Sequence, residues 1–147
     1  MKTELESALQ ELKELPYRVL LVEDDADLRV LLERILCADH ACVKIDWAAS
    51  AEAAMKIIES AIDISTRPPF DLIVVDNFLE GTVSGLDFWR LCQVTFPRIP
   101  VVMTSSMSAN KFFRSVGEGS IAPPFLSKPF SLLECREMFE SVNAVGF

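Results

Sequence analysis

The chain has 147 residues, of which 50% are hydrophobic and 24% are charged. This length and composition fit one globular domain and exclude a disordered or low-complexity chain. With 14 basic and 22 acidic side chains, the formal net charge is -8, which disfavours nucleic acid and anionic membranes as direct partners. The apolar runs are too short to span a bilayer and residues 1–6 do not resemble a secretory signal, so we expect a cytoplasmic protein.

The first expected element is an amphipathic helix at the N-terminus. Thr3 and Glu6 have the spacing of a capping box, and the helix should stop at Pro16. Leucines recur between them at helical spacing, namely Leu5, Leu9, Leu12 and Leu15. We therefore divide the chain into this helix (1–16) and a main domain (17–147). We expect the helix to pack on its own domain, with pairing to a second copy as the alternative.

The main domain alternates β-rich runs with amphipathic stretches, as in a parallel sheet covered by helices on both faces. The expected strands are residues 17–22, 41–47, 72–75, 101–104 and 125–127. The expected helices are residues 27–37, 51–61, 85–94, 109–116 and 132–142, with Ser50, Ser84 and Ser131 as caps for three of them. The second strand alternates apolar and polar residues, so we expect it at an edge of the sheet.

The four cysteines, Cys37, Cys42, Cys92 and Cys135, lie in apolar contexts and include no C-x-x-C pair. Small buried thiols in a reducing compartment are therefore expected, rather than a disulfide or zinc framework. Cys37 and Cys42 are close enough in sequence to meet across a turn, which leaves a redox role open for this pair.

Polar residues follow four of the expected strands, where parallel sheets form their binding crevices. Glu23, Asp24 and Asp25 follow the first strand, and Asp76, Ser105 and Lys128 follow the third, fourth and fifth. Carboxylates that converge in a crevice repel one another unless a cation lies among them, and oxygen ligands suit Mg2+ or Mn2+. With a lysine and a hydroxyl beside them, such a site is suited to accept a phosphoryl group.

The sequence resembles the receiver domains of two-component response regulators over residues 17–142. The resemblance lies in RVLLVEDD (18–25), LIVVD (72–76), IPVVMTSS (99–106) and FLSKPF (125–130), with the Lys128–Pro129 bond typically cis in this family. It implies a flavodoxin-like α/β fold, a five-stranded parallel doubly wound sheet in the order 2-1-3-4-5. The N-terminal helix is an addition to that fold.

The resemblance also implies roles for individual residues. Asp76 would be the phosphoacceptor, and Mg2+, with Mn2+ as an alternative, would be held by Asp76, Asp24 and the backbone carbonyl of Phe78. Glu23 would act on the metal through water. Ser105 and Lys128 would bind the phosphoryl oxygens. Ser105 and Phe125 would form the conformational switch, with Thr104 as the alternative to Ser105.

A receiver domain of this kind is a phosphoacceptor regulator rather than an enzyme. Its phosphoryl donor would be a histidine kinase or histidine phosphotransfer protein. The face built from residues 109–116, 125–127 and 132–142 would then control a downstream protein or output domain, and a homodimer is a further option. On that face, Phe113 is expected either to contact a partner or to be half-buried.

Two alternatives remain beside this interpretation. One is a pseudo-receiver that binds partners without being phosphorylated. The other is a phosphatase of the haloacid dehalogenase type, although its Asp-x-Asp motif is replaced here by Asp76-Asn77-Phe78.

The sequence departs from the family pattern after Asp76. Glu80 replaces the usual proline and Gly85 comes one residue later than the usual glycine, so we expect a reshaped loop at 77–84. Phe78 and Met107 are apolar at positions that flank the path of a hydrolytic water, which predicts a long-lived phosphoryl group.

Overall fold

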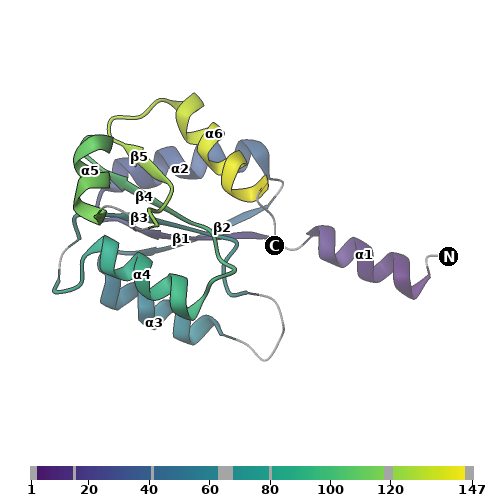
Figure 1. The fold of residues 1–147 in the computed structure, drawn as a ribbon. Helices are drawn as coiled ribbons and strands as arrows, with labels where there is room; N and C mark the ends of the chain where they lie inside the picture. Colours follow the sequence, from purple (N-terminus) through teal and green to yellow (C-terminus); the bar gives the residue numbers. More distant parts are fainter. Residues whose placement is uncertain are drawn as a thin grey trace.

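The computed structural model describes residues 3–14, 16–40, 42–62, 68–79, 81–117 and 121–144. Across these residues a leading helix is followed by alternating strands and helices (Figure 1). In chain order the elements are α1 (Glu4–Glu14), β1 (Tyr17–Val22), α2 (Ala26–Asp39), β2 (Val43–Ala48), α3 (Ala51–Ala61), β3 (Leu72–Asp76), α4 (Gly85–Thr95), β4 (Val101–Ser105), α5 (Ala109–Val116), β5 (Phe125–Ser127) and α6 (Leu132–Ala144). None of the helices in these ranges is long and apolar enough to cross a lipid bilayer.

The strands form one parallel sheet in the order β2-β1-β3-β4-β5, which confirms the predicted fold class and strand order. The pairing aligns the carboxyl ends of the central strands, with Val22 opposite Val75 and Asp76 opposite Thr104. As predicted, β2 is an edge strand. It begins at Val43, and Ala41, the predicted first residue, lies outside the described residues.

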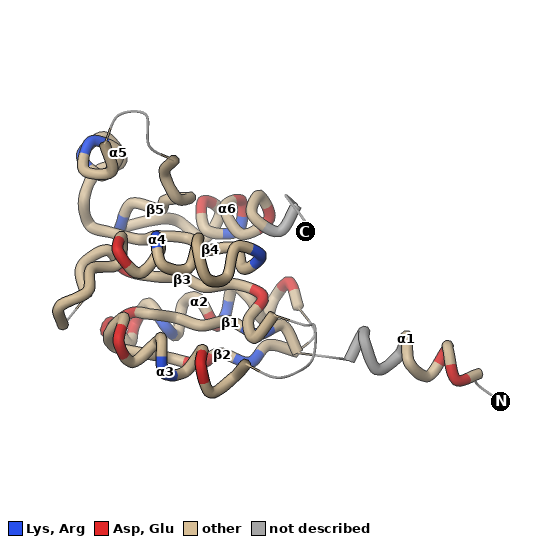
Figure 2. Tube along the Cα trace, turned by 60° about the horizontal axis from the view of Figure 1, so that its bottom comes forward, with Lys and Arg blue, Asp and Glu red and all other residues tan. Residues whose placement is uncertain are grey.

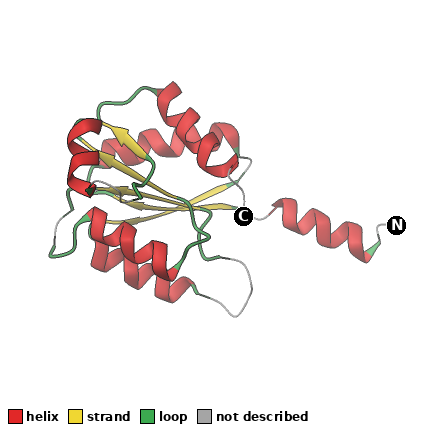
Figure 3. Ribbon diagram, viewed as in Figure 1, coloured by secondary structure: helices red, strands yellow, loops and turns green. Residues whose placement is uncertain are grey.

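Helices cover both faces of the sheet (Figure 3), and a cluster of buried apolar side chains lies between the sheet and the helices on each face. Successive side chains of a strand point to opposite faces, so a strand covered on both sides must be apolar at every position. In β1, Leu20 and Val22 belong to the cluster under α3, α4 and α5, whereas Val19 and Leu21 belong to the cluster under α2 and α6. Each fully buried aliphatic side chain of this kind stabilises the fold by about 1.5–3 kcal/mol.

Side chains cap the helices at the predicted positions. Each capping oxygen accepts a hydrogen bond from a backbone N–H of the first turn, which would otherwise lack a partner. These bonds are Thr3 to Glu6, Ser50 to Ala53, Ser84 to Asp87 and Ser131 to Glu134. At Thr3 and Ser131 the glutamate returns a bond to the capping residue, completing a capping box.

Helix α1 leads away from the sheet (Figures 1 and 2). Leu5 and Leu9 are 70% and 49% exposed, so the expected packing of this helix on its own domain is wrong for these two leucines. Residues 3–9 are all exposed, because this part of α1 lies clear of the sheet and its helices (Figure 1). Acidic positions lie at the free end of the helix (Figure 2), where Glu4 and Glu6 occupy the first turn.

Two of the four cysteines differ from the expectation. Cys92 and Cys135 are fully buried, and burial raises the pKa of each thiol to about 12. Cys37 and Cys42 are exposed, which corrects the prediction that all four are buried. They lie near the end of α2 and directly before β2, where the edge of the sheet is open to solvent.

Candidate functional site

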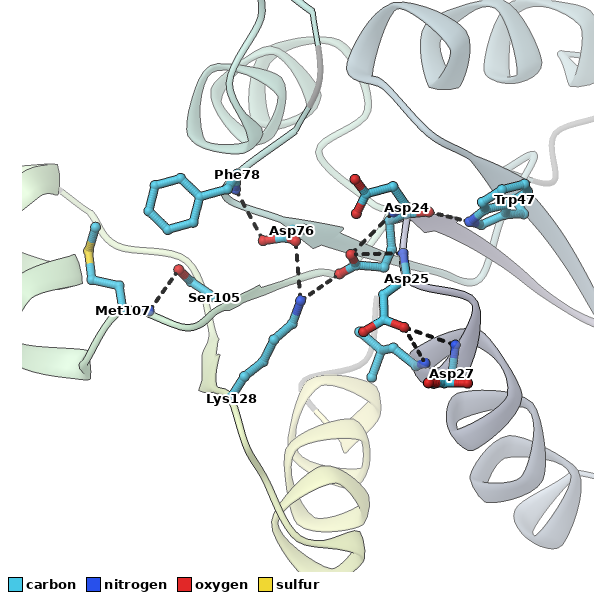
Figure 4. Close-up of polar contacts among 11 residues, drawn as sticks. Asp24, Asp25, Asp27, Trp47, Asp76, Phe78, Ser105, Met107 and Lys128 are labelled. Atoms are coloured by element: carbon cyan, nitrogen blue, oxygen red, sulfur yellow. Dashed lines mark hydrogen bonds and ion pairs between the residues drawn. The ribbon is translucent and has the colours of Figure 1, made fainter.

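The carboxyl ends of β1, β3, β4 and β5 bring together four polar residues that are far apart in the sequence (Figure 4). Glu23 follows β1, Asp76 ends β3, Ser105 ends β4 and Lys128 follows β5. All but Lys128 are buried, with Glu23 1%, Asp76 7% and Ser105 0% exposed. Buried polar groups are rare unless they have partners or a function.

Lys128 joins two of the buried carboxylates. Its Nζ lies 2.8 Å from Oε2 of Glu23 and 3.2 Å from Oδ2 of Asp76. The Lys128–Pro129 peptide bond is cis, as predicted. The three side chains come from three different strand ends, so the sheet itself fixes their spacing.

The electrostatics of the site follow from burial and from this shared ammonium. Burial raises the pKa of Glu23 to about 7, against the hydrogen bond from Lys128, which lowers it. For Lys128, burial would lower the pKa, but the hydrogen bond to Glu23 and the negative charge of Asp76 outweigh it and raise the pKa. Lys128 therefore keeps its positive charge beside Asp76.

Asp24 completes an acidic cluster with Glu23 and Asp76. One carboxylate oxygen of each residue lies within 4.8 Å of the others, and Asp24 is exposed to solvent. A hard divalent cation such as Mg2+ prefers oxygen ligands of this kind and retains waters at its open positions. The donor set therefore fits such an ion.

Asp25 does not join this cluster. Its Oδ1 accepts hydrogen bonds from the backbone N–H groups of Asp27 at 2.9 Å and Leu28 at 3.4 Å, which makes it the N-cap of α2. Of the three consecutive acidic residues after β1, two face the site and the third begins a helix.

Contacts that the sequence did not reveal hold the acidic turn in place. The indole Nε1 of Trp47 in β2 donates to the backbone carbonyl of Glu23. Oε1 of Glu23 accepts from the backbone N–H groups of Asp24 at 3.2 Å and Asp25 at 3.3 Å. The bond from Trp47 depends on the register of β1 and β2, which the sequence does not reveal. A tryptophan near the end of the strand that neighbours β1 is the signal that could have suggested it.

The loop after Asp76 begins with two backbone contacts. The N–H of Asn77 donates to the carbonyl of Thr104 at 2.8 Å, and the N–H of Phe78 donates to Oδ1 of Asp76 at 3.1 Å. The side chain of Phe78 is 55% exposed. Figure 4 shows Phe78 and Met107 on the side of Asp76 that faces away from the acidic turn.

Ser105 and Thr104 lie on opposite faces of the sheet. The Oγ of Ser105 accepts from the N–H of Met107 at 3.1 Å, while Oγ1 of Thr104 is buried without a hydrogen-bond partner in the described part of the chain. Phe125 packs in the same cluster as Met103, two residues before Ser105. Ser105 therefore shares a face with Phe125, and Thr104 does not.

Comparison with known proteins finds similarity over most of the chain. The family profile described as the response regulator receiver domain matches residues 19–140. The alkaline phosphatase synthesis transcriptional regulatory protein SphR of Synechococcus elongatus is 32% identical over 129 residues, which cover 82% of this chain and 48% of SphR. The chain thus spans about half the length of the curated relatives it matches.

Solved structures share the fold. The receiver domain of NtrX from Brucella abortus is 23% identical, with a TM-score of 0.68 over 87% of this chain and 99% of that one. The response regulator protein TrrA from Thermotoga maritima, in complex with Mg(2+)-BeF, is 24% identical, with a TM-score of 0.66 over 85% of this chain and 97% of that one.

Proposed function

Because the chain belongs to the response regulator receiver domain family, we propose that Asp76 accepts a phosphoryl group from the phosphohistidine of a histidine kinase or histidine phosphotransfer protein. A carboxylate oxygen of Asp76 forms the new bond to phosphorus as the bond to the donor's histidine nitrogen breaks, and the nitrogen keeps the electron pair. The observation that carries this proposal is the ion pair between Lys128 and Asp76 at 3.2 Å in a buried site.

The acidic cluster would hold Mg2+, with Mn2+ as the alternative. Asp24 and Asp76 would be direct ligands, Glu23 would act through water, and the backbone carbonyl of Phe78 would complete the protein's share of the shell. When bound, the cation neutralises charge on the phosphoryl oxygens. TrrA, which shares the fold, has been solved with Mg(2+)-BeF.

Lys128 and Ser105 would bind the phosphoryl oxygens, and Ser105 with Phe125 would transmit the change. An ammonium and a hydroxyl aimed at the transferred group stabilise the charge that it carries. The inward movement of Ser105 would alter the packing of Phe125, which lies on the same face of the sheet. The surface formed by α5, β5 and α6 would then change its affinity for a partner.

The chain acts in this proposal as a regulator that is phosphorylated, not as an enzyme with a separate substrate. Residues 17–147 would form the receiver domain and residues 1–16 an appended helix. Its downstream partner would be a protein target or output domain, with homodimerisation as a further option. SphR, a relative about twice as long, is named as a transcriptional regulatory protein.

Intact mass spectrometry tests the proposal directly. We expect one added phosphoryl group after incubation with Mg2+ and acetyl phosphate, and none in Asp76→Asn. No addition to the wild type, with Mg2+ binding retained, would instead support a pseudo-receiver. Turnover of p-nitrophenyl phosphate by the wild type would support a phosphatase.

A further inference from the structure

Glu52 in α3 binds the loop that follows Asp76. Thirty residues separate Glu52 from Thr82, yet Oε1 of Glu52 accepts hydrogen bonds from the Thr82 N–H at 3.1 Å and the Thr82 hydroxyl at 3.0 Å. The same oxygen accepts from the N–H of Val83 at 3.1 Å. One carboxylate oxygen thus joins α3 to two consecutive residues of the loop at 77–84.

Gly81 makes room for this carboxylate. Its φ of +98° is a backbone conformation that side chains disfavour, and a Cβ at this position would lie 2.7 Å from Oε2 of Glu52. Oε2 itself is buried, and no hydrogen-bond donor meets it among the residues that the structure describes. Gly81 therefore leaves the space that the Glu52 carboxylate occupies, and a side chain at residue 81 would displace that carboxylate.

Backbone contacts hold both ends of the loop close to Asp76 and Asn77. Near its start, the Phe78 N–H bonds Oδ1 of Asp76 at 3.1 Å. At its end, the N–H of Gly85 donates to the carbonyl of Asn77 at 3.2 Å, and a Cβ on Gly85 would lie only 2.1 Å from the backbone oxygen of Asp76. Thr82 and Val83, the residues that Glu52 binds, thus lie two to three residues before the close backbone contact of Gly85 with Asp76.

We propose that Glu52 is a positioning residue for the phosphoacceptor site, holding the loop so that the backbone carbonyl of Phe78 stays in place to bind the metal. This inference rests on the proposed function, because it concerns the same metal site. The loop lacks the family's proline at residue 80 and reaches its glycine one residue late. The carboxylate supplies from α3 a restraint on the loop backbone at Thr82 and Val83.

The test is Mg2+ affinity, measured by calorimetric titration with MgCl2 as the probe. Groups that support a metal ligand from outside the shell typically change affinity by about 10-fold to 100-fold when removed. We expect Glu52→Ala to weaken Mg2+ binding by about tenfold. Glu52→Gln, which keeps an acceptor oxygen, should recover part of the loss. Glu59→Ala is the matched control, because Glu59 is an exposed glutamate on the same helix.

Thr82→Val provides a second variant that removes one donor from the same contact while keeping the side-chain shape. It should weaken Mg2+ binding less than Glu52→Ala. A purely structural role would lower the free energy of unfolding of Glu52→Ala but leave the Mg2+ affinity of the folded protein unchanged. Equal affinities in wild type and folded Glu52→Ala would therefore overturn the positioning role alone. Absence of Mg2+ binding by the wild type would overturn the proposed function, and the positioning role with it.

Discussion

Phe112 and Phe125 are stacked, with 4.1 Å between their ring centroids and 8° between their planes. Phe112 comes from α5 and is fully buried. Phe113 meets the two rings edge-on, at 5.5 Å from Phe112 and 6.0 Å from Phe125. The proposed switch residue Phe125 is therefore in direct contact with α5, part of the surface proposed to bind partners.

The two adjacent phenylalanines of α5 should differ in their effect on stability. Phe112 is buried, so Phe112→Ala should lower the free energy of unfolding by about 3–5 kcal/mol. Phe113 is 46% exposed, so Phe113→Ala should cost only about 1 kcal/mol. Urea unfolding of both variants measures the difference. Equal losses would show that the two rings contribute alike, contrary to the packing described here.

The strands and helices could be predicted because short stretches of sequence determine where each of them forms. Strands buried on both faces need continuous apolar runs, and the serine caps precede amphipathic stretches, so the edge strand and the caps follow from the pattern. The strand order followed from the resemblance to receiver domains and is confirmed by the structure. The sequence also placed Glu23, Asp76 and Lys128 at the same edge of the sheet, because the carboxyl ends of parallel strands lie along one edge. These three side chains do form the ion pairs of the site.

Contacts and exposures that depend on the path of the loops could not be predicted from the sequence. The contact between Glu52 and Thr82 joins residues thirty apart, and no periodicity connects a helix to a distant loop. Asp25 caps α2 instead of joining the acidic cluster, because the helix begins at the next residue. Cys37 lies on the exposed side of α2, one turn after Glu33, and Cys42 lies in the connection before β2, so their apolar neighbours in the sequence did not reveal their exposure.

Gly85 should be intolerant of any side chain. A Cβ there would lie 2.1 Å from the oxygen of Asp76 and 2.7 Å from the Cα of Asn77, and both are backbone atoms that cannot swing aside. We expect Gly85→Ala to lower the free energy of unfolding by about 3 kcal/mol, at the upper end of the cost of overpacking. Chemical denaturation would measure it. The neighbouring cap variant Ser84→Ala should lose only about 1 kcal/mol, and a smaller loss in Gly85→Ala than in Ser84→Ala would contradict the close packing.

The contact made by Glu52 should weaken in acid. Hydrogen bonds from its own backbone amide and from the Thr82 hydroxyl hold the pKa of Glu52 below its ordinary value of 4.5. A carboxyl whose pKa is lowered by folding stabilises the protein above the unfolded pKa and loses that contribution as the pH falls through the folded pKa.

Comparison with Glu52→Gln isolates this effect, because glutamine does not titrate. The stability advantage of the wild type over Glu52→Gln should be constant above about pH 6 and shrink below about pH 4.5. Urea unfolding of both proteins across this range provides the measurement. A difference that stays the same down to about pH 3 would mean that the charge of Glu52 contributes nothing to the contact.

The lifetime of the phosphoryl group should depend on Phe78. Its side chain is 55% exposed next to Asp76 but carries no group that can orient a water for attack on phosphorus. We expect Phe78→Asn to shorten the half-life of the phosphorylated protein about tenfold, below the roughly 100-fold that a well-placed acid–base group contributes. The substitution keeps the backbone carbonyl proposed to bind the metal. Intact mass measured over time after removal of acetyl phosphate gives the decay rate.

Val94→Asn, at an exposed position of α4, is the control and should leave the rate unchanged. An unchanged rate in Phe78→Asn as well would reject the proposed role of the apolar side chain.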